Sequence, residues 1–97
     1  TDSIALGALQ YCRSHEIRVP GDVMISAVGD SKAGRVAYVP LTSAHLHYHS
    51  AGRTAAELLL ELLADPDAAP QYRMLGYELK RRDSTGDENS GEDIWAQ

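Results

Sequence analysis

The sequence predicts an α/β fold, a parallel sheet flanked by helices, and three observations predict it. Two segments carry apolar residues at helical spacing, and a short apolar run rich in β-branched residues lies between them. A polar loop with two glycines follows that run, where the loops of parallel sheets commonly hold ligands. The length of 97 residues suits one small domain, so we expect one domain and not two.

The first helix is expected from Asp2 to Glu16. Its apolar residues share the three- and four-residue spacing of one helical face: Ile4, Ala5, Ala8, Leu9 and Cys12. Thr1 or Asp2 is expected to accept hydrogen bonds from the first turn. The helix ends before Pro20, because proline disfavours helical geometry at the residue that precedes it.

Two extended segments follow the first helix. The run from Val23 to Val28 is almost wholly apolar, which predicts a strand buried on both faces. The polar loop comes next, at residues 29–34, and Leu41 to Tyr48 is then expected to be extended. Arg73 to Lys80 alternates apolar and charged residues, which predicts a last strand.

The second helix has the clearest pattern in the sequence. It is expected to begin at about Ser50 as N-cap and to end at Asp65, before Pro66. Arg53 is expected to pair with Glu57, one turn later. A wide apolar stripe runs along the helix: Ala51, Ala55, Leu58, Leu59, Leu62 and Leu63.

The formal charge of −5 is unevenly distributed. Residues 1–82 hold nine acidic and nine basic residues, and the acidic excess lies at the end: Asp83, Asp87, Glu88, Glu92 and Asp93. By composition, the last fifteen residues are typical of a solvated tail. Without a basic patch, this chain by itself is not expected to bind DNA.

The remaining composition predicts a soluble, cytoplasmic protein. No apolar run approaches the roughly 18 to 20 residues that span a bilayer, and no segment is typical of a signal peptide. Cys12 is the only cysteine, so it forms no internal disulfide. The chain begins with Thr1 and not Met, so we expect it to be part of a longer protein.

Three histidines, His45, His47 and His49, alternate along the second extended segment. In a strand, their side chains would leave one face about 6.6 to 7 Å apart, close enough for two of them to share a zinc ion. The segment supplies no carboxylate or cysteine to complete a metal site. We therefore expect partly exposed histidines, no bound metal and no other cofactor, and keep a metal-dependent enzyme as an alternative.

The sequence offers little for nucleophilic catalysis. Cys12 lies on the apolar face of the first helix, where burial makes a thiol unreactive. Ser31 does not lie in a Gly-x-Ser-x-Gly motif, and no glycine pattern typical of phosphate or dinucleotide loops occurs. We therefore expect no enzyme. Asp30 has two open interpretations, as a ligand for sugar hydroxyls beside a covering Tyr48 or as a turn residue.

Several segments together resemble the C-terminal part of the effector domain of LacI/GalR-family transcriptional repressors. They occur in the family's order and spacing: Asp2 to Leu9, Ile17 to Val23, Pro40 to Ser43, Gly52 at the start of the leucine helix, and Arg81 to Thr85. The resemblance covers residues 1–85 and leaves 86–97 as an acidic tail outside it. The loop Gly29-Asp30-Ser31 and the segment from Thr42 to Gly52 are most similar to the sucrose and trehalose repressors.

The resemblance implies a periplasmic-binding-protein-like fold that binds a small sugar or sugar phosphate and controls operator DNA through a headpiece that this chain lacks. Effector-holding positions of the family fall on Thr1, Gly29, Leu46 and Tyr48. Two of them lack the usual side chain, since the family often has Asp at Gly29 and Gln at Leu46. The expected effector residues are therefore Thr1, Asp30, Ser31 and Tyr48, with Asp30 replacing the missing Asp.

The resemblance also implies a homodimer. We expect its contact on the first helix and on the loop from Lys32 to Val39. A sugar-binding protein of a transport system has the same fold and is the alternative function, although the ending Arg82 to Thr85 favours the repressor.

Overall fold

The computed structural model describes residues 1–87, which divide into two compact units. The first unit contains Thr1–His45 and the described chain from Glu78 onward, and the second contains Leu46–Tyr77. The chain therefore leaves the first unit after His45 and returns to it at Glu78. The length of the chain alone predicted one domain, and this division was not expected.

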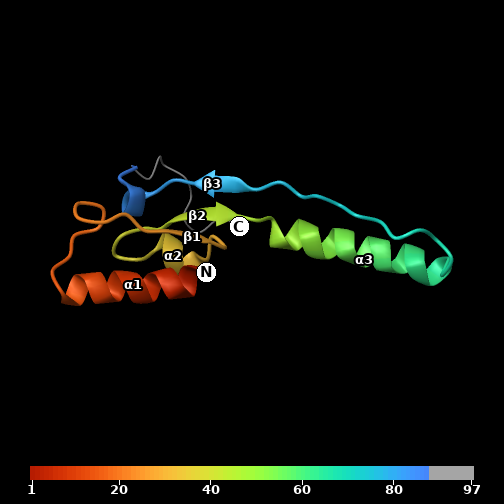
Figure 1. The fold of residues 1–97 in the computed structure, drawn as a ribbon, viewed down its shortest axis with the longest axis horizontal. Helices are drawn as coiled ribbons and strands as arrows, with labels where there is room; N and C mark the ends of the chain where they lie inside the picture. The colour runs from red at the N-terminus through yellow and green to blue at the C-terminus, as the bar shows by residue number, and fades with distance from the viewer. Residues whose placement is uncertain (88–97) are drawn as a thin grey trace. The chain divides into compact units, whose positions relative to one another are not determined.

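The first unit is built on a three-stranded sheet in the order β1 (Ser26–Val28), β2 (Thr42–His45) and β3 (Glu78–Lys80) (Figure 1). β1 and β2 are parallel, with Ser26 opposite Thr42. β2 and β3 are antiparallel, with Ser43 opposite Lys80. The parallel pair confirms the predicted α/β class, and β3 makes the sheet mixed.

Two helices belong to the first unit, α1 (Asp2–Ser14) and α2 (Lys32–Arg35). The core consists of Ala5 and Leu9 of α1 and of Leu41, the residue before β2. Further apolar side chains pack around it: Leu6, Val19, Ile25, Ala27, Ala37 and Val39. Cys12 is buried, as predicted, whereas Ile4 is exposed. The buried face of α1 is therefore narrower than its apolar pattern indicated.

The second unit contains α3 (Tyr48–Ala64), which begins two residues earlier than predicted. His47 is its N-cap residue, in the left-handed region at φ 54°, so the prediction of Ser50 as N-cap was wrong. The predicted pair forms, with Arg53 Nε 3.4 Å from Glu57 Oε1. Every residue of α3 is at least partly exposed.

The predicted strand from Val23 to Val28 is shorter in the structure and less buried. Only Ser26–Val28 pairs with a neighbour, and Ser26 and Val28 are exposed. The prediction of burial on both faces was wrong because β1 is an edge strand among the described residues, and this unit covers it incompletely.

The tail begins later than composition suggested. Asp83–Thr85 form a short 3-10 helix, and Ser84 is fully buried. The Ser84 hydroxyl accepts from the Thr42 amide at 2.8 Å and donates to the Ile25 carbonyl at 2.5 Å. Small hydroxyl residues can bridge buried backbone groups, which a count of polar residues does not detect. Most of the predicted tail, residues 88–97, lies outside the described part of the chain.

Candidate functional site

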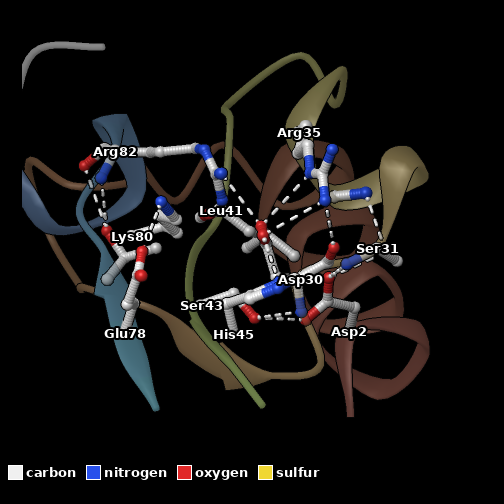
Figure 2. Close-up of polar contacts among 12 residues, drawn as sticks. Asp2, Asp30, Ser31, Arg35, Leu41, Ser43, His45, Glu78, Lys80 and Arg82 are labelled. Carbon is white, nitrogen blue, oxygen red and sulfur yellow. Dashed lines mark hydrogen bonds and ion pairs between the residues drawn. The ribbon is translucent and has the colours of Figure 1, made fainter. Parts of the chain in front are cut away.

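Polar side chains gather at the carboxyl edge of the parallel pair, beside the start of α1 (Figure 2). β1 leads into the loop Gly29-Asp30-Ser31, and β2 ends at His45. Parallel strands end at the same edge of a sheet, and ligands of α/β proteins bind outside that edge. Gly29 and Asp30 both have positive φ, at 131° and 53°, so the loop bends sharply as it leaves β1.

The carboxylate of Asp30 is the centre of a buried charged cluster. Its Oδ1 accepts from Arg82 Nη2 at 2.9 Å and from Arg35 Nε at 3.3 Å. Its Oδ2 accepts from Arg35 Nη2 at 3.2 Å and from His45 Nδ1 at 3.1 Å. We call Asp30, Arg35, His45 and Arg82 the Asp30 cluster. Buried charges require such partners, because water no longer solvates them.

The two arginines of the Asp30 cluster also make hydrogen bonds outside the Asp30 carboxylate. Arg82 Nη1 donates to the Leu41 carbonyl at 2.8 Å, and the Arg82 amide donates to Thr42 Oγ1 at 2.7 Å. Arg35 Nη2 donates to the carbonyl of Asp30 itself at 3.0 Å. The cluster therefore joins the loop after β1 to the start of β2 and to the segment that follows β3.

Asp2 lies beside the cluster and fixes the other side of the loop. Its Oδ2 accepts from the Ser31 amide at 2.6 Å and the Ser31 hydroxyl at 2.7 Å, and its Oδ1 accepts from the Ser43 hydroxyl at 2.7 Å. A Cβ on Gly34 would approach Asp2 Oδ2 to 2.7 Å, so a larger residue here would force Asp2 to shift from its hydrogen bonds. The prediction that Thr1 or Asp2 caps α1 was wrong, because Thr1 makes no side-chain cap and Asp2 binds Ser31 and Ser43.

The surroundings of Asp2 favour its ionised form. Burial by itself raises the pKa of this carboxyl group. Hydrogen bonds from Ser43 and Ser31, together with the positive charge of Arg82, outweigh burial and hold the pKa below its ordinary value. Asp2 is therefore a carboxylate at neutral pH.

The structure places three of the four predicted effector residues in the first unit and one in the second. Asp30 and Ser31 lie at the carboxyl edge, and Thr1 is exposed next to Asp2. Tyr48 is the exposed first residue of α3, in the second unit. Contact of these residues with an effector stays a prediction. What the sequence did not indicate is that the Asp30 carboxylate binds three side chains of its own protein.

The three histidines occupy different structural positions. His45 ends β2, His47 precedes α3, and His49 lies within α3. The prediction that the three histidines alternate along one strand was therefore wrong. Among residues 1–87, no group of three histidine, cysteine or carboxylate side chains is placed to hold a metal ion. No helix of the described chain has the length and hydropathy to cross a membrane.

Sequence reasoning missed four residues that build this edge: Asp2, Arg35, Ser43 and Arg82. Asp2, Ser43 and Arg82 lie in segments that resemble the repressor family, and that resemblance was the available signal. Arg35 was missed because residues 29–34 were expected to be a loop, whereas α2 turns Arg35 back toward Asp30.

Ligands of α/β proteins bind outside the carboxyl ends of parallel strands, and the polar loop after β1 lies at this position. Residues 1–85 match the family model of the periplasmic binding protein-like domain. The chain belongs to this family, in the form found in LacI/GalR-type transcriptional regulators.

Individual relatives confirm the predicted family. The HTH-type transcriptional regulator GalR of Streptococcus thermophilus is 35% identical over 85 residues, which are 88% of this chain and 26% of the relative. A LacI-family regulator from Sanguibacter keddieii has a solved structure with 33% identity and a TM-score of 0.84, covering 90% of this chain and 34% of that one. A LacI-family regulator from Lactobacillus casei, solved with bound sucrose, has 27% identity and a TM-score of 0.73, covering 87% and 30%. The chain therefore spans about a quarter of the length of the curated relatives that it matches.

Proposed function

We propose that this chain is the effector-sensing and dimerisation part of a LacI/GalR-type transcriptional repressor. The observation that carries the proposal is the polar loop at the carboxyl edge of β1 and β2, in a chain that matches regulators over residues 1–85. A small sugar or sugar phosphate binds at this edge and changes the relative stability of two conformations of the whole protein. The operator is bound by a headpiece elsewhere in the parent protein.

The bound sugars of a solved relative support a saccharide as effector. The Lactobacillus casei regulator was solved with sucrose and, in another structure, with glucose. In our proposal the hydroxyls of Thr1 and Ser31, both in the first unit, bind sugar hydroxyls. Asp30 contributes to the proposed site through its ion pairs with Arg35 and Arg82, which fix the loop after β1.

The test uses the full-length protein and a panel of glucose, galactose, sucrose, trehalose and glucose 6-phosphate. Calorimetry measures binding, and fluorescence anisotropy measures affinity for an operator selected from a random DNA library. We expect at least one saccharide to bind and to change operator affinity. If none binds, or if operator affinity is the same with and without the bound saccharide, the proposal is wrong.

Thr1 offers a direct test of the proposed site. Thr1→Val removes the hydroxyl and keeps the side-chain shape, and Thr1 makes no side-chain cap whose loss would disturb α1. We expect saccharide affinity to fall about threefold to tenfold, the effect of one lost hydrogen bond. Ser3→Ala, which removes an exposed hydroxyl two residues later, is the control and should leave affinity unchanged.

We also infer that the protein dimerises through α1 and residues 32–39. Ile4, Tyr11 and Tyr38 are exposed on these segments, and large exposed apolar side chains commonly contribute to protein interfaces. Tyr38 is held in place, since its hydroxyl donates to the Leu9 carbonyl at 2.8 Å and the Arg13 guanidinium lies 4.7 Å from its ring centre. A hollow beside it is lined by residues of both segments: Leu6, Leu9, Gln10, Arg13, Ala37 and Tyr38.

The dimer contact is tested by introducing charge on this surface. Ile4→Glu should weaken the dimer at least about tenfold, because an unpaired carboxylate would be buried at the contact. Met24→Glu changes an equally exposed apolar residue outside the surface and should leave the dimer intact. Sedimentation velocity of the full-length variants gives the dissociation constants. A dimer of Ile4→Glu as strong as that of Met24→Glu would contradict the inference.

A further inference from the structure

We propose that the hydroxyl of Ser31 recognises the saccharide as a hydrogen-bond acceptor only, and that Asp2 is the positioning residue that fixes it in this role. This assignment rests on the proposed function and states which group the saccharide supplies at one point of the site. A saccharide hydroxyl that meets Ser31 must donate its proton, so a group that can only accept is rejected there.

The proton of the Ser31 hydroxyl is directed at Asp2. Ser31 Oγ donates to Asp2 Oδ2 at 2.7 Å. Asp2 is a carboxylate at neutral pH, and a carboxylate only accepts hydrogen bonds. If the hydroxyl turned its proton toward a ligand, a buried carboxylate would lose one of its donors. Hydrogen bonds to a charged group are stronger than those between neutral groups, so the proton stays on the Asp2 side.

The other polar groups of Ser31 leave an acceptor and no donor. Its hydroxyl oxygen accepts from the Gly34 amide at 3.1 Å, as the N-cap of α2. A hydroxyl oxygen has two lone pairs, so one remains after this bond. The Ser31 amide donates to Asp2 Oδ2 at 2.6 Å, and the Ser31 carbonyl accepts from the Arg35 amide at 3.1 Å. Toward a ligand, Ser31 therefore offers the second lone pair of its hydroxyl.

Exposure separates the residue that contacts the saccharide from the residue that positions it (Figure 2). Asp2 is 4% exposed and Ser43, which also donates to Asp2, is fully buried. Ser31 is partly exposed, and Thr1 is exposed. Thr1 makes no side-chain cap, so its hydroxyl can donate as well as accept. Thr1 therefore tolerates a partner that only accepts, whereas Ser31 does not.

Analogues of the saccharide test the contact with Ser31. The probes are the saccharide of the panel that binds the full-length protein most tightly and, one position at a time, its deoxyfluoro and aminodeoxy analogues. Fluorine removes the donated proton, whereas an amino group still donates. At one position we expect fluorine to weaken binding about tenfold and the amino group to weaken it less. In Ser31→Ala the same fluorine should cost less than about twofold, because the partner is gone. Ser3→Ala, at an exposed position, is the control and should keep the tenfold ratio.

Three further variants test whether Asp2 positions Ser31. Asp2→Ala removes the acceptor, so the Ser31 proton is free to turn toward the ligand, and the cost of fluorine should fall below about threefold. Gly34→Ala should act in the same direction, because its Cβ would come within 2.7 Å of Asp2 Oδ2 and displace it. Asp2→Asn is the matched control, since its amide oxygen can still accept from Ser31, and it should keep the tenfold ratio.

The ratio of two affinities in one variant is informative, because lost stability lowers both affinities alike. A fluorine cost that is the same in wild type and Ser31→Ala at every position would overturn the contact with Ser31. A tenfold ratio that survives Gly34→Ala and, if it folds, Asp2→Ala would overturn the positioning role of Asp2, as would its loss in Asp2→Asn. Failure of every saccharide of the panel to bind wild type would instead overturn the proposed function.

Discussion

The two units of this chain differ in how much of their own apolar surface they bury. In the first unit, Leu9 and Leu41 are buried, and even the charged Arg82 is almost inaccessible to solvent. In the second unit, the 17-residue helix α3 contains no buried residue, although a wide apolar stripe runs along it. A helix of this pattern gains its stability from packing of the stripe. The second unit therefore requires a packing surface that residues 1–87 do not provide, whereas the first unit has a core of its own.

The two units also differ in the kind of polar interaction that they contain. The first unit has a small core, and its buried polar network joins segments more than 40 residues apart, as in the hydrogen bond from Arg82 to the Leu41 carbonyl. The polar contacts described within the second unit are exposed and local, such as the pair Arg53–Glu57 and the bond of Gln71 to Glu61 at 3.1 Å. Exposed pairs contribute little to stability, so disrupting the two units should have very different effects.

The largest effect is expected for Arg82→Met. The substitution keeps an apolar stem of similar length, removes the closer of the two donors to Asp30 Oδ1, at 2.9 Å, and removes the Arg82 donor of the Leu41 carbonyl. Breaking a buried ion pair by removing one partner costs about 3 kcal/mol or more. Chemical denaturation of the full-length protein measures the change. Arg81→Met, at the exposed neighbouring position, should change stability by less than about 0.5 kcal/mol. Equal effects would show that the Asp30 cluster is not what holds the first unit together.

A smaller effect distinguishes the two faces of α3. Leu59 and Leu60 are both exposed in this chain, at 56% and 65%, but only Leu59 belongs to the apolar stripe. If the rest of the parent protein covers the stripe, Leu59→Ala in the full-length protein should cost about 2 kcal/mol. Leu60→Ala should cost less than about 0.5 kcal/mol. Thermal unfolding of the two variants measures this difference. Similar losses for both would mean that the stripe is not a packing surface.

The elements that could be predicted from the sequence were those with a local signal. The spacing of Leu9 and Cys12 predicted α1, and the leucines of α3 predicted that helix to within two residues at its start. β1 was predicted too long, because a run of apolar residues does not show how many of them find a partner strand. The division into two units was not predictable from length, since it depends on which contacts the chain makes.

The candidate site was only partly predictable, for a physical reason. The loop at Asp30 follows an apolar run, so its place at the carboxyl edge followed from the sequence and the parallel pair confirmed it. Its partners did not follow, because Asp2 and Arg82 are 28 and 52 residues away from Asp30 along the chain. Only the fold brings such residues together. The three alternating histidines show that a regular spacing in the sequence can also mislead. β2 ends at His45 and His47 has a left-handed backbone conformation, so the three side chains do not share one strand.

The smallest of the three expected effects depends on pH and concerns Asp2. Its folded-state pKa lies below the ordinary value of 3.8, so the ionised carboxylate stabilises the fold. This contribution is fully present well above pH 3.8 and is lost as the pH falls through the lower folded-state pKa. Asp2→Asn should therefore cost about 1.5 kcal/mol at pH 7, the lower end of the range for hydrogen bonds to a charged group. The difference from wild type should shrink when unfolding is measured below about pH 4.

Asp22→Asn is the matched control, because the pKa of Asp22 is also lowered, by a hydrogen bond from the side chain of Arg18. That pair is exposed, with 78% of the Arg18 side chain and 42% of the Asp22 side chain accessible, so solvent and salt screen it. Its contribution should be smaller and should disappear in high salt, whereas that of Asp2 should persist. A salt-sensitive Asp2, or one whose effect is constant between pH 7 and pH 3, would show that the carboxylate does not act through the buried bonds to Ser31 and Ser43. The start of α1 would then be held by apolar packing of Ala5 and Leu9 alone, and the loop at Asp30 would depend on its arginines.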